Sequence, residues 1–377
     1  MKFLIIIPQM DSRIGGMERF VIEISTRLSK LGHEITILAG KSKNPISIRG
    51  VKIIRKRIFF PRLFNKAIKY IHLSFYATQH LKKNNYDFVL AMGHSGIFLK
   101  DFIWRASGSP IFIIKKEKSK LKLNLLSKLY LALDLYTQKI IERCCIQKAT
   151  CHMFPSIALK NYFEKEYGFA AKKSFIPCSG TFNILTNKKN KLINWKSIKN
   201  KIKLLCIGGL SQEIKGRDTI LTAFSKSDIS KLKIIVIGKM SGKVNETLKK
   251  EIINLEKVDY KDMPDLYQNC DILIYPSFHE GFPNVILEAA SFGMAIISTK
   301  IDGIDEYFKD NEEILLINKR DVGALAEAMS KLIKDKKLRK LLGKNILKRA
   351  TKFNYNKLTE EFIDFIQTEK SRNLLGV

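Results

Sequence analysis

The sequence predicts an α/β protein made of two doubly wound domains, each built on a parallel β-sheet. Short β-rich apolar runs alternate with segments of helical periodicity in both halves of the chain. The 377 residues are too many for one ordinary core and suit two domains of ordinary size. A polar stretch rich in Lys and Asn, 183–201, separates the two sets of runs and marks the connection between the domains.

The β-rich runs give the expected order of the strands. They lie near residues 3–7, 35–39, 51–54, 87–92, 202–207, 232–237, 271–275 and 295–299. The first of them could be mistaken for a signal peptide, but it is too short and lacks a small-residue cleavage site. We therefore expect an N-terminal domain over 1–182, the linker, a C-terminal domain over 202–354 and a final helical segment within 355–377.

Three further features of the sequence restrict the class of protein to which it can belong. After the first strand, apolar residues recur at the spacing of an amphipathic helix: Met17, Phe20, Val21, Ile24, Leu28 and Leu31. No run reaches the roughly 18 uncharged apolar residues of a membrane span, so we expect a soluble or peripheral cytoplasmic protein. The six cysteines form no C-x-x-C pair and have no His partner at zinc spacing, which favours reduced thiols and no structural metal.

The stretch from Ser277 to Ala290 carries the strongest functional signal. It follows a short apolar run that suits a buried parallel strand, and residues 284–292 read as a helix. Glu280 then lies on the strand-to-helix loop, and Gly281 lets that loop turn tightly. The first N–H groups of a helix have no internal acceptor, so they can bind a phosphate or a sugar hydroxyl. Glu288 follows on the helix and is expected to face the same crevice.

This stretch resembles the E-x7-E signature of retaining nucleotide-sugar glycosyltransferases of family 4, which have the two-domain B-type fold, GT-B. Further motifs of the same family are matched by Gly15-Gly16-Met17-Glu18-Arg19, Gly32 to Leu38, Lys215-Gly216-Arg217-Asp218 and Gly303-Ile304-Asp305-Glu306. The resemblance covers roughly the whole chain. It implies two Rossmann-like doubly wound domains that face a cleft, and a final helix that crosses back to the first domain.

The resemblance also assigns roles to the C-terminal motif. Glu280 would hydrogen-bond the hydroxyls of the transferred sugar, and Glu288 would bind the ribose of the nucleotide. The N–H groups near Gly281, Phe282, Asn284 and Val285 would meet the sugar and the phosphates. Carboxylates suit diols because each one accepts from two donors. In the family the leaving phosphate is thought to take the proton of the acceptor on the front face, so Glu280 need not be a nucleophile.

The donor diphosphate also needs positive charge, because a metal-independent enzyme must stabilise its leaving group with cations and N–H dipoles. Lys215 is the candidate catalytic cation, and Gly15 and Gly16 would let the backbone approach the donor phosphates. The family usually has an Arg where this chain has Gly209. Arg217 lies nearby and is a candidate substitute, with a solvated surface role as the alternative. No D-x-D occurs in the sequence, which favours a mechanism without metal or other cofactor.

This chain also differs from the family pattern in a residue expected to contact the acceptor. The family commonly carries a His after a strand of the N-terminal domain, but here the run 110–114 is followed by Lys115-Lys116-Glu117. His94, in Gly93-His94-Ser95-Gly96, is the nearest candidate for an acceptor contact. A structural or solvated histidine is the alternative.

The formal net charge of +31 exceeds what solubility requires and predicts attraction to polyanions. Residues 55–64, continuing to 83, interleave bases with large apolar groups, and 115–128 repeats the pattern, as in segments that dock on anionic membranes. A solvated basic helix face is the alternative. No nucleic-acid-binding signature occurs, so we expect no nucleic-acid partner.

Together these features predict a retaining, metal-independent glycosyltransferase. It would move a hexose-type sugar from a nucleotide diphosphate sugar, with UDP-sugars favoured by family frequency, to a cell-envelope glycan or a lipid-linked saccharide at the cytoplasmic membrane face. A weakly active or inactive nucleotide-sugar-binding protein is the alternative that the missing Arg allows. Epimerases and phosphorylases share the architecture. The sequence does not name the sugar, the base, the acceptor, the linkage or the oligomeric state.

Overall fold

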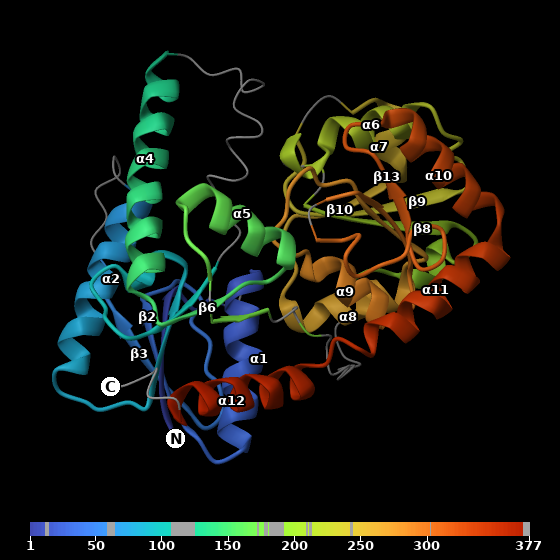
Figure 1. Cartoon of the computed structure of the whole chain (residues 1–377). Helices are drawn as coiled ribbons and strands as arrows, with labels where there is room; N and C mark the ends of the chain where they lie inside the picture. The colour runs from blue at the N-terminus through green and yellow to red at the C-terminus, as the bar shows by residue number, and fades with distance from the viewer. Residues whose placement is uncertain are drawn as a thin grey trace. The chain divides into compact units, whose positions relative to one another are not determined.

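A computed structural model describes residues 1–11, 15–58, 65–106, 125–171, 173–176, 180, 192–208, 210, 213–241, 244–301 and 303–371. The chain divides into two compact units, the first formed by Met1–Cys178 with Tyr355–Val377 and the second by Ser179–Asn354. Each unit is an α/β structure around one parallel sheet (Figure 1). The predicted fold class, two doubly wound parallel-sheet domains, is confirmed.

The first unit has a seven-stranded sheet in the order β3-β2-β1-β4-β5-β6-β7. The strands are β1 (Lys2–Gln9), β2 (Glu34–Gly40), β3 (Val51–Lys56), β4 (Phe88–Met92), β5 (Ile103–Arg105), β6 (Cys151–Met153) and β7 (Ser174–Phe175). The helices are α1 (Gly16–Lys30), α2 (Asn65–Leu81), α4 (Leu125–Lys148), α5 (Ile157–Tyr167) and α12 (Tyr355–Ser371), with the 3-10 helix η1 (Gly93–Gly96).

Strand periodicity explains how this sheet is covered. Side chains along a strand point alternately to opposite faces, so a strand that is apolar throughout is buried on both sides. In β1, Phe3 and Ile5 pack with apolar residues of α1 and α12, whereas Leu4 and Ile6 pack with residues of α2, α4 and α5. The last helix therefore belongs to the core of the first unit, where Phe175 and Phe362 also meet with ring centroids 5.8 Å apart.

The second unit repeats this plan with a six-stranded sheet in the order β10-β9-β8-β11-β12-β13. Its strands are β8 (Ile202–Ile207), β9 (Leu232–Ile237), β10 (Ile252–Leu255), β11 (Ile272–Tyr275), β12 (Ala295–Thr299) and β13 (Leu315–Ile317). Its helices are α6 (Arg217–Ser225), α7 (Glu246–Glu251), α8 (Met263–Asn269), α9 (Asn284–Ser291), α10 (Val322–Lys334) and α11 (Lys336–Ala350), with the 3-10 helices η3 (Trp195–Ile198), η4 (Glu213–Lys215) and η5 (Tyr260–Asp262).

The topology decides where a ligand can bind. In each sheet the first strand of the unit, β1 or β8, lies between the second and the fourth, so the chain winds outward in both directions from this point. Doubly wound sheets bind ligands beyond the carboxyl ends of the strands at such a switch point. In the second unit the point lies between β8 and β11.

All eight predicted strands are present at nearly the predicted positions. The sequence did not reveal β5, β6, β7, β10 and β13, which have two to four residues each. Among the residues that the structure describes, no helix is long and apolar enough to cross a membrane. The five described cysteines are free thiols.

Candidate functional site

The candidate site lies where β11 leaves the sheet of the second unit. The strand ends at Tyr275, a loop follows, and α9 begins at Asn284 with Pro283 at its N-cap. The predicted succession of buried strand, loop and helix is thus confirmed. Glu280 lies on this loop, beyond the carboxyl end of β11 and beside the switch point.

A second segment is fixed against this loop by its backbone. The N–H of Phe278 donates to the carbonyl of Ile214 at 2.8 Å. Gly216 has φ of 82°, and a Cβ at this position would lie 2.3 Å from the carbonyl oxygen of Pro276. Only glycine therefore fits this close approach. The result is that Lys215, between Ile214 and Gly216, is held next to the Glu280 loop.

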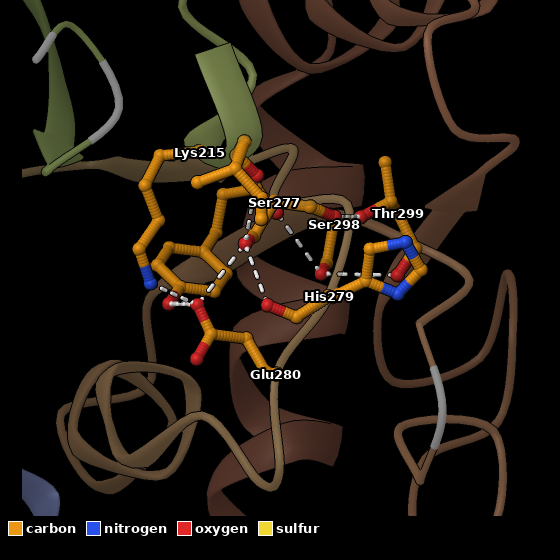
Figure 2. A network of polar contacts seen from close by, with 8 residues as sticks. Lys215, Ser277, His279, Glu280, Ser298 and Thr299 are labelled. Carbon is orange, nitrogen blue, oxygen red and sulfur yellow. Dashed lines mark hydrogen bonds and ion pairs between the residues drawn. The ribbon is translucent and has the colours of Figure 1, made fainter. Parts of the chain in front are cut away.

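The carboxylate of Glu280 is the centre of a hydrogen-bond network (Figure 2). Its Oε1 accepts from the ammonium of Lys215, from the hydroxyl of Tyr275 at 2.7 Å and from Oγ of Ser277 at 3.0 Å. Within the described part of the chain, no side chain or backbone donor reaches Oε2. The network therefore fixes the carboxylate through one oxygen and leaves the other to accept from a ligand.

Tyr275 was not foreseen as a site residue. Its side chain is 5% exposed, and burial, followed by the adjacent Glu280 carboxylate, raises its pKa well above the ordinary range. The phenol therefore stays protonated and remains a donor throughout the physiological pH range. The charge of Glu288 also raises this pKa, to a smaller extent. Because Tyr275 is the last residue of an apolar strand, its pattern resembled that of an ordinary core position.

Glu288 itself is buried at 7% exposure on α9. The hydroxyl of Tyr267, a residue of α8, donates to its Oε2. A buried carboxylate needs such a donor, since burial without a hydrogen bond would be costly. Glu288 is therefore held in a defined orientation by a residue that the sequence did not point to.

The neighbouring strand β12 holds the loop through two hydroxyl groups (Figure 2). Oγ1 of Thr299 donates to the carbonyl of Ser277, and Oγ of Ser298 donates to the carbonyl of Tyr275 at 3.2 Å. Both hydroxyls are fully buried at the end of β12. These bonds fix the backbone that carries the Glu280 network.

The start of α9 offers polar groups to a ligand. Pro283 provides no capping side chain, so the first N–H groups, including those of Asn284 and Val285, have no side-chain cap. Oδ1 of Asn284 is buried and has no hydrogen-bond partner. Gly281 is half-buried, whereas Phe282 is buried with its ring edge-on to Tyr307 at 5.1 Å, so only its backbone is suited to a ligand.

The structure does not bring Arg217 into this network. Its guanidinium is paired with Asp218, with Nε at 2.6 Å from Oδ1, and it also donates to Oγ of Ser241 at 3.2 Å. Gly209, where the second cation is missing, lies outside the described residues. In the described ranges, no group of three or more His, Cys, Asp or Glu side chains is arranged to hold a metal ion.

The remaining predicted residues belong to the first unit. Gly15 is the N-cap of α1 and Gly16 its first residue, as predicted. A Cβ on Gly15 would lie 2.7 Å from Oε2 of Glu18, whose carboxylate covers the start of the helix. Burial raises the pKa of Glu18.

His94 lies in η1 at the carboxyl end of β4 and is only 2% exposed. Burial lowers its pKa to about 4, so its contact with Glu142, 3.7 Å from Nε2 to Oε1, is that of a neutral imidazole at neutral pH. Its ring lies 4.8 Å from that of Tyr70. The side chain is thus enclosed by protein. Its predicted contact with an acceptor stays a prediction.

Two family models match the chain. The model of Glycosyltransferase Family 4 matches residues 14–179, and the model of Glycosyl transferases group 1 matches residues 187–349. The two matches adjoin and follow the two halves of the chain.

Curated proteins similar to this chain are named as glycosyltransferases. An N,N'-diacetylbacillosaminyl-diphospho-undecaprenol alpha-1,3-N-acetylgalactosaminyltransferase of Campylobacter jejuni is 33% identical over 30% of this chain and 31% of that protein. The chain thus spans about a third of this relative's length. The alpha-1,4-N-acetyl-D-galactosaminyltransferase of the same organism that acts on GalNAc-alpha-(1->4)-GalNAc-alpha-(1->3)-diNAcBac-PP-undecaprenol is 24% identical over 98% of this chain and 99% of that protein.

Solved structures share the fold. Sucrose-phosphate synthase of Thermosynechococcus elongatus superposes with a TM-score of 0.80 and 16% identity, covering 98% of this chain and 99% of that one. Anabaena HepE, in complex with UDP and glucose, superposes with a TM-score of 0.68 and 16% identity, covering 98% and 100%.

Proposed function

Because the chain belongs to the family 4 glycosyltransferases, we propose that it moves a hexose-type sugar from a nucleotide diphosphate sugar to a cell-envelope glycan or a lipid-linked saccharide, with retention of configuration and without a metal. The observation that carries this proposal is the Glu280 carboxylate, held at Oε1 by Lys215, Tyr275 and Ser277 with Oε2 open. Such a carboxylate accepts hydrogen bonds from sugar hydroxyls at a fixed position.

The site residues take complementary roles in this proposal. Oε2 of Glu280 accepts from the transferred sugar, and the first N–H groups of α9 donate to the sugar and the diphosphate. Lys215 is 31% exposed and turns from Glu280 to the diphosphate when the donor binds. Its charge then stabilises the departing nucleotide diphosphate. Glu288, oriented by Tyr267, accepts from the ribose.

The reaction itself exchanges one bond for another at the anomeric carbon. The bond from this carbon to the phosphate oxygen breaks, and a bond to the acceptor oxygen forms on the same face. The proton of the acceptor hydroxyl passes to the phosphate oxygen that leaves. The protein contributes orientation and electrostatic stabilisation, which need neither a metal nor a protein nucleophile.

UDP-sugars are the proposed donors. Support comes from HepE, which has the same fold and was solved with UDP and glucose. The proposed acceptor is lipid-linked, because the relatives from Campylobacter jejuni are named for undecaprenyl-diphosphate-linked substrates. We place the reaction at the cytoplasmic face of the membrane, where the protein is peripheral.

A weakly active or inactive nucleotide-sugar-binding protein is the second candidate. Two observations favour it: position 209 has no Arg, and Arg217 is paired with Asp218. In the described site, Lys215 is then the cation nearest to Glu280. Such a protein would bind the donor but release little or no nucleotide.

The test is nucleotide release from UDP-, GDP- and ADP-sugars, with and without a membrane lipid extract. Wild type is compared with Glu280→Ala and with Glu246→Ala, a matched control because Glu246 is an exposed acid at the start of α7. We expect release with one donor that requires the extract, is lost in Glu280→Ala and persists in Glu246→Ala. Donor binding without release would favour the second candidate.

A further inference from the structure

Helix α11 of the second unit carries an unusual charge distribution. Its sequence, KKLRKLLGKNILKRA, contains seven basic residues and no acidic one. Among the helices described in the second unit, α6 to α10 each contain at least one Asp or Glu. The cations of α11 are therefore not neutralised within their own helix.

The two arginines of α11 serve the fold. Nε of Arg349 lies 2.9 Å from Oε1 of Glu313, and Arg339 donates to the carbonyls of Leu332 and Ile333. The lysines differ from them, because within the described residues no ion pair or hydrogen bond reaches their ammonium groups. These lysines are Lys336, Lys337, Lys340, Lys344 and Lys348, and all are exposed.

Two large apolar side chains lie on the same face. Leu341 is 54% exposed and Leu347 is 41% exposed. Positions 337, 340, 341, 344, 347 and 348 follow the spacing of one helical face, so two leucines lie among four lysines on it. We call these six residues the α11 face.

The rest of the helix fixes the α11 face in orientation. Leu342 and Ile346 are buried in the cores of the second unit. At Gly343 the helix approaches the turn that follows α9 so closely that a Cβ would lie 2.1 Å from the carbonyl oxygen of Gly293. The helix runs along the side of the second unit in Figure 1. It cannot rotate to bury the leucines, since the opposite side is already packed.

We propose that the α11 face docks on an anionic phospholipid bilayer surface. The charges are complementary, because unpaired lysines attract anionic headgroups and the whole chain carries a net charge of +31. The leucines enter the boundary between headgroups and acyl chains while the lysine stems extend to the phosphates. A nucleic acid would satisfy the lysines but gives no role to the leucines. The inference deepens the proposed function, since a lipid-linked acceptor lies in such a membrane.

The experiment is flotation of the full chain with vesicles of phosphatidylglycerol and phosphatidylcholine, and with phosphatidylcholine alone, at about 0.15 M salt. The first variant changes Lys337, Lys340, Lys344 and Lys348 to Gln, and the second is Leu341→Gln with Leu347→Gln. The control changes the same number of exposed lysines elsewhere in the second unit: Lys226, Lys231, Lys257 and Lys261 to Gln. Thermal melting checks the fold, which should persist because Gln is a good helix former.

Each lysine near an anionic surface contributes roughly a fivefold change in partitioning. We expect the α11 lysine variant to need at least about tenfold more anionic lipid for half-maximal binding, and the control to change less than about threefold. The leucine variant should also bind more weakly, and phosphatidylcholine vesicles should bind none of the proteins.

Two flotation results would overturn the inference: no binding of wild type to anionic vesicles, or equal losses of binding in the α11 lysine variant and the control. Binding to duplex RNA is measured as well. If the leucine variant bound vesicles as wild type does while the lysine variant lost binding to RNA, the α11 face would be a nucleic-acid surface and the inference would also be wrong. Flotation is done without donor and repeated with Glu280→Ala. Failure of sugar transfer would therefore leave this result unaffected, and the two proposals are tested separately.

Discussion

The hydroxyl of Tyr275 provides a test of how the Glu280 carboxylate is positioned. Tyr275→Phe removes one donor, 2.7 Å from Oε1, and leaves Lys215 and Ser277 in place. The ring itself remains to fill the buried position. The change therefore alters the orientation of the carboxylate without creating a cavity.

The size of the effect follows from the type of bond. A hydrogen bond to a charged group contributes about 1.5–3 kcal/mol, which corresponds to roughly 10–10² in rate if it acts fully in the transition state. Because two other donors still hold Oε1, we expect a value near the lower end, a decrease of about tenfold in kcat. The affinity for the free nucleotide should stay unchanged, since Tyr275 contacts the sugar-binding carboxylate.

The assay measures initial rates of nucleotide release over a range of donor concentrations, with thermal melting as a check on folding. Tyr267→Phe is the comparison, because it removes the donor to Glu288 and should weaken nucleotide binding instead. If Tyr275→Phe kept kcat within about twofold of wild type with an intact fold, the hydroxyl would have no positioning role.

Three further predictions follow from the structure. Lys215→Ala should lower nucleotide release by roughly 10²–10³ because it removes the cation beside the diphosphate, and near-normal release would contradict this role. The pKa of His94 is about 4 in the folded state against 6.5 in the reference state, so the unfolded state binds its proton more readily and stability falls as pH decreases from 6.5 to 4. Denaturant unfolding should show up to about 3 kcal/mol of this loss in wild type and less in His94→Gln; equal pH dependence would refute the assignment. Gly343→Ala should lower the free energy of unfolding by roughly 1–3 kcal/mol because its Cβ meets the carbonyl of Gly293, and unchanged melting would show that α11 can shift.

The long strands could be predicted from the sequence because their burial on both faces leaves continuous apolar runs, as in β1 and β8. The short edge strands could not, since β7 has two residues and β13 three, and these are defined by pairing with neighbours. Pairing with a neighbouring strand depends on tertiary position, which local periodicity does not record.

The site likewise combines residues that local sequence motifs reveal with residues that only the tertiary structure brings together. Glu280 and Lys215 were named from motifs, and the structure brings them into direct contact although they are 65 positions apart. Tyr275 was missed because a tyrosine in an apolar strand resembles a core residue. Tyr267 was missed because it lies on a short mixed helix, MPDLYQN, outside every motif named in the sequence. A hydroxyl at the last position of a strand that precedes a ligand loop is the signal that could have revealed Tyr275. Of the basic segments 55–64, continuing to 83, and 115–128 proposed for membrane docking, residues 59–64 and 115–124 lie outside the described residues.

In the proposed reaction the Glu280 carboxylate receives the donor sugar through its open oxygen, Oε2. The most direct test is Glu280→Gln, which keeps the shape and removes the charge, measured for donor turnover and for binding of UDP alone. We predict that nucleotide release falls by roughly 10²–10³ while UDP binding is retained. Normal turnover in Glu280→Gln, with the fold intact, would contradict the account.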